Sequence, residues 1–304
     1  MSNSIQVRVE RLYLVVSTTK NWPIAILIWL GLINFGLVRF KNDELFKLSK
    51  ANWVQYLERV YLFHYFPDAK IFDEIVKFNY KNKDLVFDCG RYGLGTVLEI
   101  FAGEPYREFF ETTKIKGKTV IDIGAAFGDT AIAFLLAGAG RVYAVEAFPG
   151  YCRLASKNIE TNGLDSKCEV MLAAVGGVAG TLTIDINLEE MFGIGVQEKE
   201  IGDTIPIVTL EQIMEDKEIN DAILKIDVEG YEYEILLNTP IKVLRQFSDM
   251  VIEYHYGPER ITNYLKEAGF NLNYTGPFAV RMPHLIGKTA QNMSVGNIYA
   301  HRMN

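Results

Sequence analysis

Acidic side chains mark the predicted ends of four strands. They are Asp122, Glu146, Asp227 and Glu253, and His255 follows the last of them by two residues. In an open α/β sheet, ligands bind beside the carboxyl ends of the strands. Carboxylates at that edge could accept hydrogen bonds from hydroxyl or ammonium groups, take up a proton, or hold a cation. The elements that must bring them together are parallel strands joined by helices.

The segment around Asp122 predicts a buried strand, a sharp turn and a helix. The turn contains Gly124 and Gly128, and an apolar run follows at once. Such a turn brings backbone N–H groups and the positive end of a helix toward a nucleoside ligand. Glu146 ends the next predicted strand, where a carboxylate can bind both hydroxyls of a ribose.

The glycine spacing bears on which nucleoside ligand is bound. Dinucleotide folds use G-x-G-x-x-G, whereas here the spacing is G-x-x-x-G and Ala126 takes the place of the middle glycine. Asp122 would also repel phosphates, but it suits a ligand that carries a sulfonium and an ammonium group. We therefore expect S-adenosylmethionine and methyl transfer rather than hydride transfer. A purely structural strand and helix would leave Glu146 unexplained.

Composition indicates a folded protein and argues against nucleic acid as a partner. Of the 304 residues 49% are hydrophobic, and the formal charge is 31 − 38 = −7. An acidic chain without a basic run is a poor ligand for a phosphate backbone. Cys89, Cys152 and Cys168 show no metal-binding or disulfide spacing, which is typical of buried thiols in a reducing compartment. We expect a cytoplasmic protein.

The pattern along the chain predicts two regions. Residues 1–110 are expected to form an N-terminal extension of helices and β-hairpins, and residues 111–304 the catalytic α/β domain. The expected strands lie near 119–124, 141–146, 168–175, 222–227, 249–254, 270–275 and 296–301. The expected helices lie near 128–138, 149–162, 209–216, 230–237 and 258–268. Residues 181–186 and 205–208 are expected to pair at an edge. The loop at 188–202 between them is expected to be either a lid over the site or an ordinary surface loop.

The extension contains an apolar stretch at residues 22–38. Its second half alternates as one strand of a hairpin, 37–41 with 44–48, so about twelve residues remain, fewer than a membrane span needs. We expect a short helix at 22–33, capped by Asn21 and packed on the main domain, with peripheral membrane contact as the alternative. The sequence shows no small-x-small cleavage site, so we do not expect a signal peptide to be removed.

The remainder of the extension carries weaker patterns. Residues 52–63 predict a helix with an aromatic face, and 84–89 and 96–101 predict strands around a glycine-rich turn. That turn lacks the lysine and serine or threonine of a phosphate loop, so no nucleotide site is expected there.

Four blocks of sequence together resemble one known family, the FkbM-type S-adenosylmethionine-dependent methyltransferases. The blocks are VIDIGAAFGDTA (120–131), VYAVEAFPGYCRLASKNIETNG (142–163), LKIDVEGYEYEIL (224–236) and VIEYH (251–255). The third block is the most specific. Weaker similarity extends upstream through residues 103–106, so the resemblance covers roughly residues 85–300. The resemblance implies a class I methyltransferase fold, Rossmann-like α/β, with a seven-stranded, mainly parallel sheet whose last strand is antiparallel and whose faces are both covered by helices. It also implies methylation of hydroxyl oxygens.

Position in this fold and the resemblance together assign the cofactor-binding residues. They come from the turn after the first strand, the end of the second strand, and the tips of the third and fourth. They are Asp122, Gly124, Ala125, Ala126, Phe127, Gly128, Asp129, Thr130, Glu146, Ala147, Phe148, Ala174 and Asp227. Ala173 is expected to leave room for the adenine ring beside Ala174.

The remaining polar residues at this edge are candidates for catalysis and acceptor binding. Asp227, Glu253 and His255 are the catalytic candidates, either as an acid–base set or as ligands of a divalent metal that the reaction does not require. Glu229 and Tyr106 are assigned to the acceptor, with Glu229 also able to cap the next helix. Arg281 and His284 on a late loop are further candidates.

The predicted function is S-adenosylmethionine-dependent O-methylation, by direct in-line transfer, of a small molecule, sugar or glycan. A non-catalytic scaffold that keeps the fold is the alternative. A nicotinamide oxidoreductase and an RNA methyltransferase rank below these, because of the glycine spacing and the acidic charge. The acceptor and the oligomeric state stay open.

Overall fold

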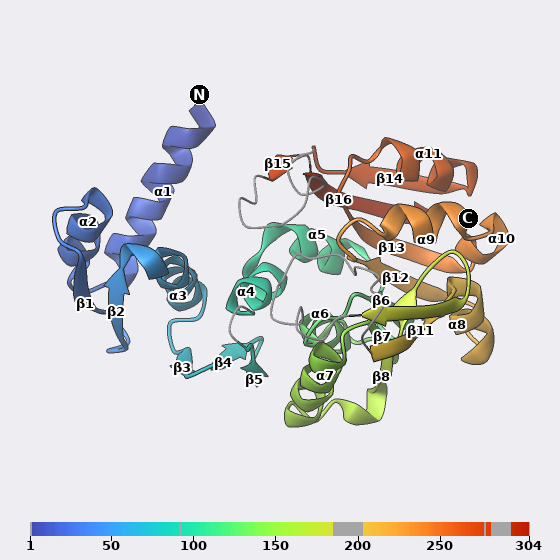
Figure 1. Ribbon diagram of the computed structural model, residues 1–304, viewed down its shortest axis with the longest axis horizontal. Helices are drawn as coiled ribbons and strands as arrows, with labels where there is room; N and C mark the ends of the chain where they lie inside the picture. Colours follow the sequence, from blue (N-terminus) through green and yellow to red (C-terminus); the bar gives the residue numbers. More distant parts are fainter. Residues whose placement is uncertain (1, 91–92, 185–202, 277, 281–292, 304) are drawn as a thin grey trace. The chain divides into compact units, whose positions relative to one another are not determined.

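The computed structural model describes residues 2–90, 93–184, 203–276, 278–280 and 293–303 (Figure 1). The chain forms two compact units, Met1–Gly103 and Glu104–Asn304, and each is described by itself. The predicted division into an N-terminal extension (1–110) and a catalytic domain (111–304) stays a prediction.

The second unit is built on a seven-stranded path of one mixed sheet. Its order is β14 (Phe270–Tyr274), β16 (Met293–Arg302), β13 (Phe247–Tyr254), β12 (Ala222–Ile226), β6 (Thr119–Ile123), β7 (Arg141–Glu146) and β8 (Cys168–Leu172). From β13 to β8 every neighbouring pair is parallel, whereas β16 is antiparallel to both of its neighbours. The expected class I methyltransferase sheet, with an antiparallel last strand, is confirmed.

Helices cover both faces of this sheet (Figure 1). They are α5 (Glu104–Thr112), α6 (Asp129–Leu136), α7 (Pro149–Thr161), α8 (Leu210–Asp216), α9 (Glu232–Asn238), α10 (Ile241–Leu244) and α11 (Glu259–Glu267), with a 3-10 turn η2 at Asp165–Lys167. Because both faces are covered, the central strands are buried throughout; all five residues of β12 are buried. This is why these strands read as nearly continuous apolar runs.

The strand order reverses direction between β6 and β12. From β6 the chain proceeds outward to β7 and β8, and it then crosses back to β12 on the other side of β6. The carboxyl ends of β6 and β12 therefore flank the point at which open α/β sheets bind ligands. The acidic residues predicted at strand ends belong to this edge.

A three-stranded sheet adjoins the end of β8. It consists of β9 (Ala174–Val175), β10 (Gly180–Ile184) and β11 (Asp203–Val208), and β10 pairs antiparallel with β11 as predicted. The predicted lid at 188–202 lies outside the described residues. A short strand, β15 (Phe278–Val280), pairs with β16.

The first unit contains four helices and two small antiparallel sheets among its described residues. The elements are α1 (Ser2–Thr18), α2 (Trp22–Leu30), β1 (Phe35–Arg39), β2 (Leu45–Ser49), a 3-10 turn η1 (Lys50–Asn52), α3 (Trp53–Tyr65), β3 (Lys70–Phe72), β4 (Ile75–Tyr80), β5 (Lys83–Asp88) and α4 (Leu94–Ala102). The expected hairpin is confirmed as β1 and β2. No helix in the described residues combines the length and hydropathy needed to cross a bilayer.

Two local predictions for this unit are wrong. The strand expected at 96–101 is part of α4, where Val97 and Phe101 are buried one turn apart, so β-branched residues misled the assignment. Asn21 makes no side-chain cap on α2. Its amide instead accepts from the backbone N–H of Arg39 at 2.7 Å and donates to the carbonyl of Leu37 at 2.9 Å, which joins the start of α2 to β1.

Candidate cofactor and acceptor site

Gly124 joins the ends of β6 and β12 by a close backbone approach. Its φ is +73°, and a Cβ built on it would lie 1.8 Å from the backbone carbonyl oxygen of Asp227. Only glycine fits such an approach. The turn that carries the cofactor motif is therefore packed directly against the residue expected to begin the acceptor half of the site.

Asp122 is fully buried below this turn and already has partners. Its Oδ2 accepts from the hydroxyl of Thr130 at 2.6 Å, and its Oδ1 lies 3.2 Å from Nζ of Lys225. Lys225 also donates to the carbonyl of Gly124 at 2.7 Å. A buried ion pair thus links β6, β12 and the first turn of α6, and it holds the turn from beneath.

The charge on Lys225 changes an argument made from sequence. Burial lowers the pKa of Lys225, but the nearby carboxylates of Asp122, Asp227 and Asp129 outweigh burial and hold that pKa above its ordinary value. The cationic lysine neutralises Asp122. Repulsion of phosphate by Asp122 is therefore a weaker reason to exclude a dinucleotide than the glycine spacing is, and direct contact of Asp122 with a cofactor stays a prediction.

Glu146 lies at the end of β7 with its carboxylate fixed by two backbone donors. The N–H of Ala126 donates to Oε2 at 2.9 Å, and the N–H of Phe148 donates to Oε1 at 2.8 Å. Burial raises the pKa of Glu146 to about 7, although these hydrogen bonds act in the opposite direction. The same carboxylate therefore organises both the turn after β6 and the start of the connection after β7.

These residues fit the nucleoside of S-adenosylmethionine. An ionised carboxylate can accept about four hydrogen bonds, so Glu146 retains capacity for the two hydroxyls of a ribose. Ala126 has a positive φ of 43°, and Gly128, with a φ of 82°, is the N-cap of α6, so the chain turns sharply just before this helix. Ala147 and Phe148 follow Glu146 directly and are half-buried.

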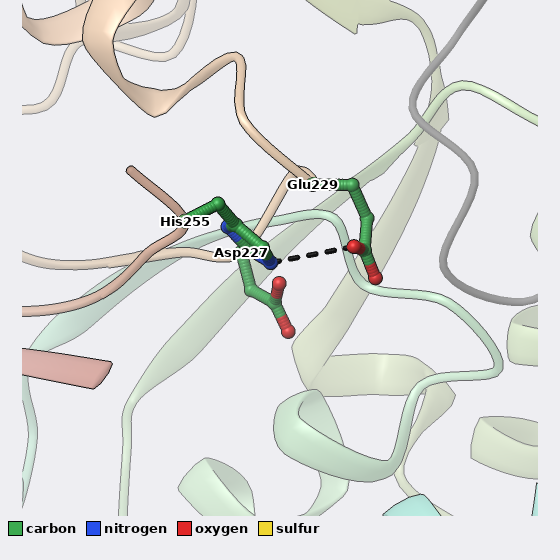
Figure 2. Close-up of side chains that lie close together, drawn as sticks. All are labelled: Asp227, Glu229 and His255. Carbon is green, nitrogen blue, oxygen red and sulfur yellow. Dashed lines mark ion pairs between the residues drawn. The ribbon is translucent and has the colours of Figure 1, made fainter. Parts of the chain in front are cut away.

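Asp227, Glu229 and His255 form the second half of the site. The chain turns sharply after β12, with positive φ at Glu229 and Gly230, and His255 follows β13. One ligand atom from each of the three side chains lies within 4.8 Å of the other two, and Figure 2 shows the three converging. The sequence predicted Asp227 with Glu253 and His255; the turn adds Glu229 to this group.

The imidazole of His255 is held between carboxylates. On one side Nδ1 lies 3.0 Å from Oε1 of Glu232; on the other Nε2 lies 3.3 Å from Oε2 of Glu229 and 3.6 Å from Oε1 of Glu253. Burial lowers the pKa of His255, but the hydrogen bonds to Glu229 and Glu232 dominate and raise it to about 11. Burial also raises the pKa of Asp227.

Other predicted site residues lie elsewhere or are not described. Tyr106 is buried in α5, where its ring lies 6.3 Å from that of Phe110, so its contact with an acceptor stays a prediction. Ala173 is buried between β8 and β9, and Ala174 pairs with Ile207. Arg281 and His284 lie outside the described residues.

Lys225 and Glu232 are functional candidates that the sequence reasoning did not assign. Lys225 is a single charge in an otherwise apolar strand, which signals a buried partner. Glu232 lies in the first turn of α9, where acidic residues are common, so nothing in its position predicts a contact with a histidine 23 residues later.

Comparison with known proteins identifies a methyltransferase domain. The profile of the FkbM methyltransferase domain matches residues 122–272, which include the strand ends from Asp122 to His255. Over 79 residues the chain is 37% identical to protein arginine N-methyltransferase 6 of Xenopus laevis, which is 26% of this chain and 23% of that protein. Over 55 residues it is 46% identical to ribosomal protein L11 methyltransferase of Pelotomaculum thermopropionicum, 18% of each chain. The chain thus spans less than a quarter of these relatives.

Solved structures with related folds are similar only at low identity. Trm5b from Pyrococcus abyssi aligns with a TM-score of 0.41 and 15% identity, over 77% of this chain and 62% of that one. Precorrin-6y C5,15-methyltransferase from Geobacter metallireducens aligns with a TM-score of 0.40 and 13% identity, over 67% and 92%.

The profile match and the strand order agree with each other. The matched residues 122–272 begin at the end of β6 and include the strands from β7 to β14. The carboxylates lie at the strand ends, the edge at which open α/β sheets bind ligands. Residues 122–272 therefore form an FkbM methyltransferase domain, on a sheet with the strand order of class I methyltransferases.

Proposed function

We propose that the protein methylates a hydroxyl oxygen of a small molecule, sugar or glycan by direct in-line transfer. The observation that carries this proposal is the group of carboxylates around His255, which lies directly beside the cofactor turn at Gly124. Carboxylates bind neutral hydroxyls and accept their protons, whereas they repel anionic acceptors. The net charge of −7 likewise argues against a nucleic acid.

The cofactor half of the site positions the methyl donor. Glu146 would hold the ribose hydroxyls, and the turn from Gly124 to Gly128 would surround the remainder of the nucleoside. Bound S-adenosylmethionine supplies a sulfonium-activated methyl group that the acceptor oxygen takes in one in-line displacement. Fixing both reactants in one site supplies a large part of the acceleration.

The acceptor half orients the hydroxyl and removes its proton. Asp227 and Glu253 are the candidate bases, because Asp227 begins the turn beside Gly124 and Glu253 lies at the end of the neighbouring strand. The Nδ1 side of His255 is occupied by Glu232, so His255 orients the carboxylates that face its Nε2. A positioned base contributes typically about 10²- to 10⁴-fold.

The test is a screen of acceptors with a labelled methyl donor. Purified protein is incubated with S-adenosylmethionine and panels of sugars, glycans, phenols and aliphatic alcohols, and products are identified by mass spectrometry. We expect acceptor-dependent formation of a methyl ether. The Glu253→Gln variant should lose about 10²-fold or more in kcat with cofactor affinity retained if Glu253 is the base. The same loss of kcat in Asp227→Asn would identify Asp227 as the base, and a loss of cofactor affinity there would identify it as a cofactor ligand.

The excess of carboxylates also favours a second candidate, methylation of a cationic nitrogen. A guanidinium or ammonium group would pair with Asp227, Glu229 and Glu253. Amine and guanidine acceptors therefore belong in the same screen, and turnover of these alone would replace the O-methylation proposal. Cofactor binding without turnover on any acceptor would support the non-catalytic scaffold instead.

A further inference from the structure

His255 presents one nitrogen to a carboxylate that is already satisfied. Oε1 of Glu232 accepts from the backbone N–H of His255 at 2.8 Å and lies 3.0 Å from Nδ1, while Oε2 accepts from the N–H of Gly230 at 2.9 Å. Glu232 is fully buried. These contacts place a hydrogen on Nδ1 and leave Nε2 as the nitrogen that faces the site.

Around Nε2 several carboxylate oxygens lie close together. Oxygens of Glu229 and Glu253 lie 3.3 and 3.6 Å from it, and Asp227 has an oxygen within 4.8 Å. In the described part of the chain, the carboxylate of Asp227 makes no hydrogen bond or ion pair. One proton on Nε2 can be donated to one oxygen at a time, so His255 cannot hydrogen-bond to both Asp227 and Glu229 at once.

We propose that Asp227, Glu229 and His255 bind one divalent transition-metal ion of the Mn²⁺ or Zn²⁺ type. Two carboxylate oxygens and one imidazole nitrogen are ligands that these ions take. Ligand atoms within 4.8 Å of one another can all reach a single ion at about 2.0–2.2 Å after small side-chain shifts. Figure 2 shows the side chains of Asp227 and Glu229, from the turn after β12, close to that of His255, which follows β13.

Glu232 has the position of a residue that orients a metal-binding histidine. Histidine ligands commonly donate their second ring N–H to a carboxylate, which selects the tautomer and fixes the ring. Here that carboxylate is buried and anchored by backbone N–H groups on both oxygens. The arrangement holds Nε2 of His255 toward Asp227 and Glu229 before any ion arrives.

The role of the ion rests on the proposed function. Three protein ligands leave coordination positions open, and an acceptor hydroxyl can occupy one of them. A bound ion would lower the pKa of that hydroxyl, and Glu253, which is not a ligand in this arrangement, would accept the proton. The oxygen keeps the electron pair that forms its bond to the methyl carbon. The bond from that carbon to the sulfonium sulfur breaks with its electrons going to sulfur, and S-adenosylhomocysteine leaves.

The test is direct binding of Mn²⁺ to the full chain after chelation and buffer exchange. Loss of the electron paramagnetic resonance signal of free Mn²⁺ reports binding, and calorimetry with Zn²⁺ reports the same site. We expect one ion per chain, and affinity at least about tenfold lower in Asp227→Asn and Glu229→Gln. Glu232→Gln should weaken binding by about 10- to 100-fold without removing a ligand.

A matched surface variant and a separate cofactor measurement complete the test. Glu211→Gln removes a carboxylate that pairs with Lys242 on the surface, and it should leave Mn²⁺ affinity unchanged. Failure of both Mn²⁺ and Zn²⁺ to bind folded wild-type protein, or equal affinity in wild type and Glu229→Gln, would overturn the metal site. Calorimetry with S-adenosylmethionine and the acceptor screen, both run without metal, show whether the methyltransferase proposal survives that result.

Discussion

The two halves of the site use carboxylates in opposite ways. In the cofactor half, Asp122 and Glu146 are each matched by donors from the protein itself: Lys225 and Thr130 for the first, backbone N–H groups for the second. In the acceptor half, Nε2 of His255 faces both Glu229 and Asp227 but can donate to only one oxygen at a time. The cofactor half is therefore organised before a ligand binds, whereas in the acceptor half Asp227 and Glu229 can take a proposed cation or hydroxyl donor.

This difference explains what each half can select. A carboxylate with fixed partners and spare lone pairs, such as Glu146, recognises a diol by hydrogen bonds at defined positions. A group of carboxylates with excess negative charge instead recognises charge and can share one ion among several oxygens. The comparison predicts that disturbing the first half changes stability and cofactor affinity, and that disturbing the second changes metal affinity and turnover.

The largest effect is expected from Lys225→Met. The substitution leaves Asp122 buried without its cation, and breaking a buried pair in this way costs about 3–5 kcal/mol of unfolding free energy. Chemical denaturation measures the change. The double variant Asp122→Asn with Lys225→Met should recover part of the loss, because no unpaired charge remains. Equal stability of wild type and Lys225→Met would show that the pair does not hold the turn.

Gly124→Ala is the next largest change. Its Cβ would lie 1.8 Å from the carbonyl oxygen of Asp227, so the two strand ends must move apart. Gly163→Ala is a matched control, since its φ of +67° is similar to +73° but nothing lies within 4 Å of its Cβ. We expect Gly124→Ala to lose about 2–3 kcal/mol more than Gly163→Ala, with cofactor binding impaired. Equal losses would mean that only the backbone conformation matters.

A crossed pair of variants tests whether the two halves are independent. Glu146→Gln removes the charge that binds the ribose hydroxyls, so the affinity for S-adenosylmethionine should fall about 10- to 100-fold while Mn²⁺ affinity is unchanged. Glu229→Gln should show the reverse pattern. Calorimetry on both variants with both ligands supplies the four values. Parallel losses of both ligands in either variant would contradict the division of the site into two halves.

The fold was predictable where the hydrophobic pattern of a short segment alone decides its structure and where its strand ends. Buried parallel strands such as β12 are continuous apolar runs in the sequence. The arrangement of these strands in the sheet was expected from the resemblance to class I methyltransferases. The strand prediction for 96–101 was wrong because the β-branched residues there lie on the buried face of a helix. Packing against residues distant in sequence decides that this segment is a helix. The predicted cap by Asn21 was wrong for the same reason, because the side-chain amide of Asn21 accepts a hydrogen bond from the backbone of Arg39 in β1 instead.

The site was predictable in its residues but only partly in its contacts. Glu146 and Asp227 could be located because a strand end places them at the ligand edge. The pairing of Lys225 with Asp122 joins residues about a hundred positions apart, and the contact of Glu232 with His255 depends on the turn at Gly230. Such contacts follow from tertiary packing, which hydrophobic periodicity does not encode.

The smallest predicted effect is the pH dependence of cofactor binding. The pKa of Glu146 is about 7 in the free protein, so this side chain is mostly ionised at pH 8 and mostly protonated at pH 6. If the ribose hydroxyls donate to the ionised form, affinity for S-adenosylmethionine should fall up to about tenfold between pH 8 and pH 6. Stability should respond with the opposite sign: because folding raises this pKa above 4.5, the contribution of Glu146 to stability is lost as pH rises through 7. Affinity that changes equally in wild type and Glu146→Gln would assign the pH dependence to another group.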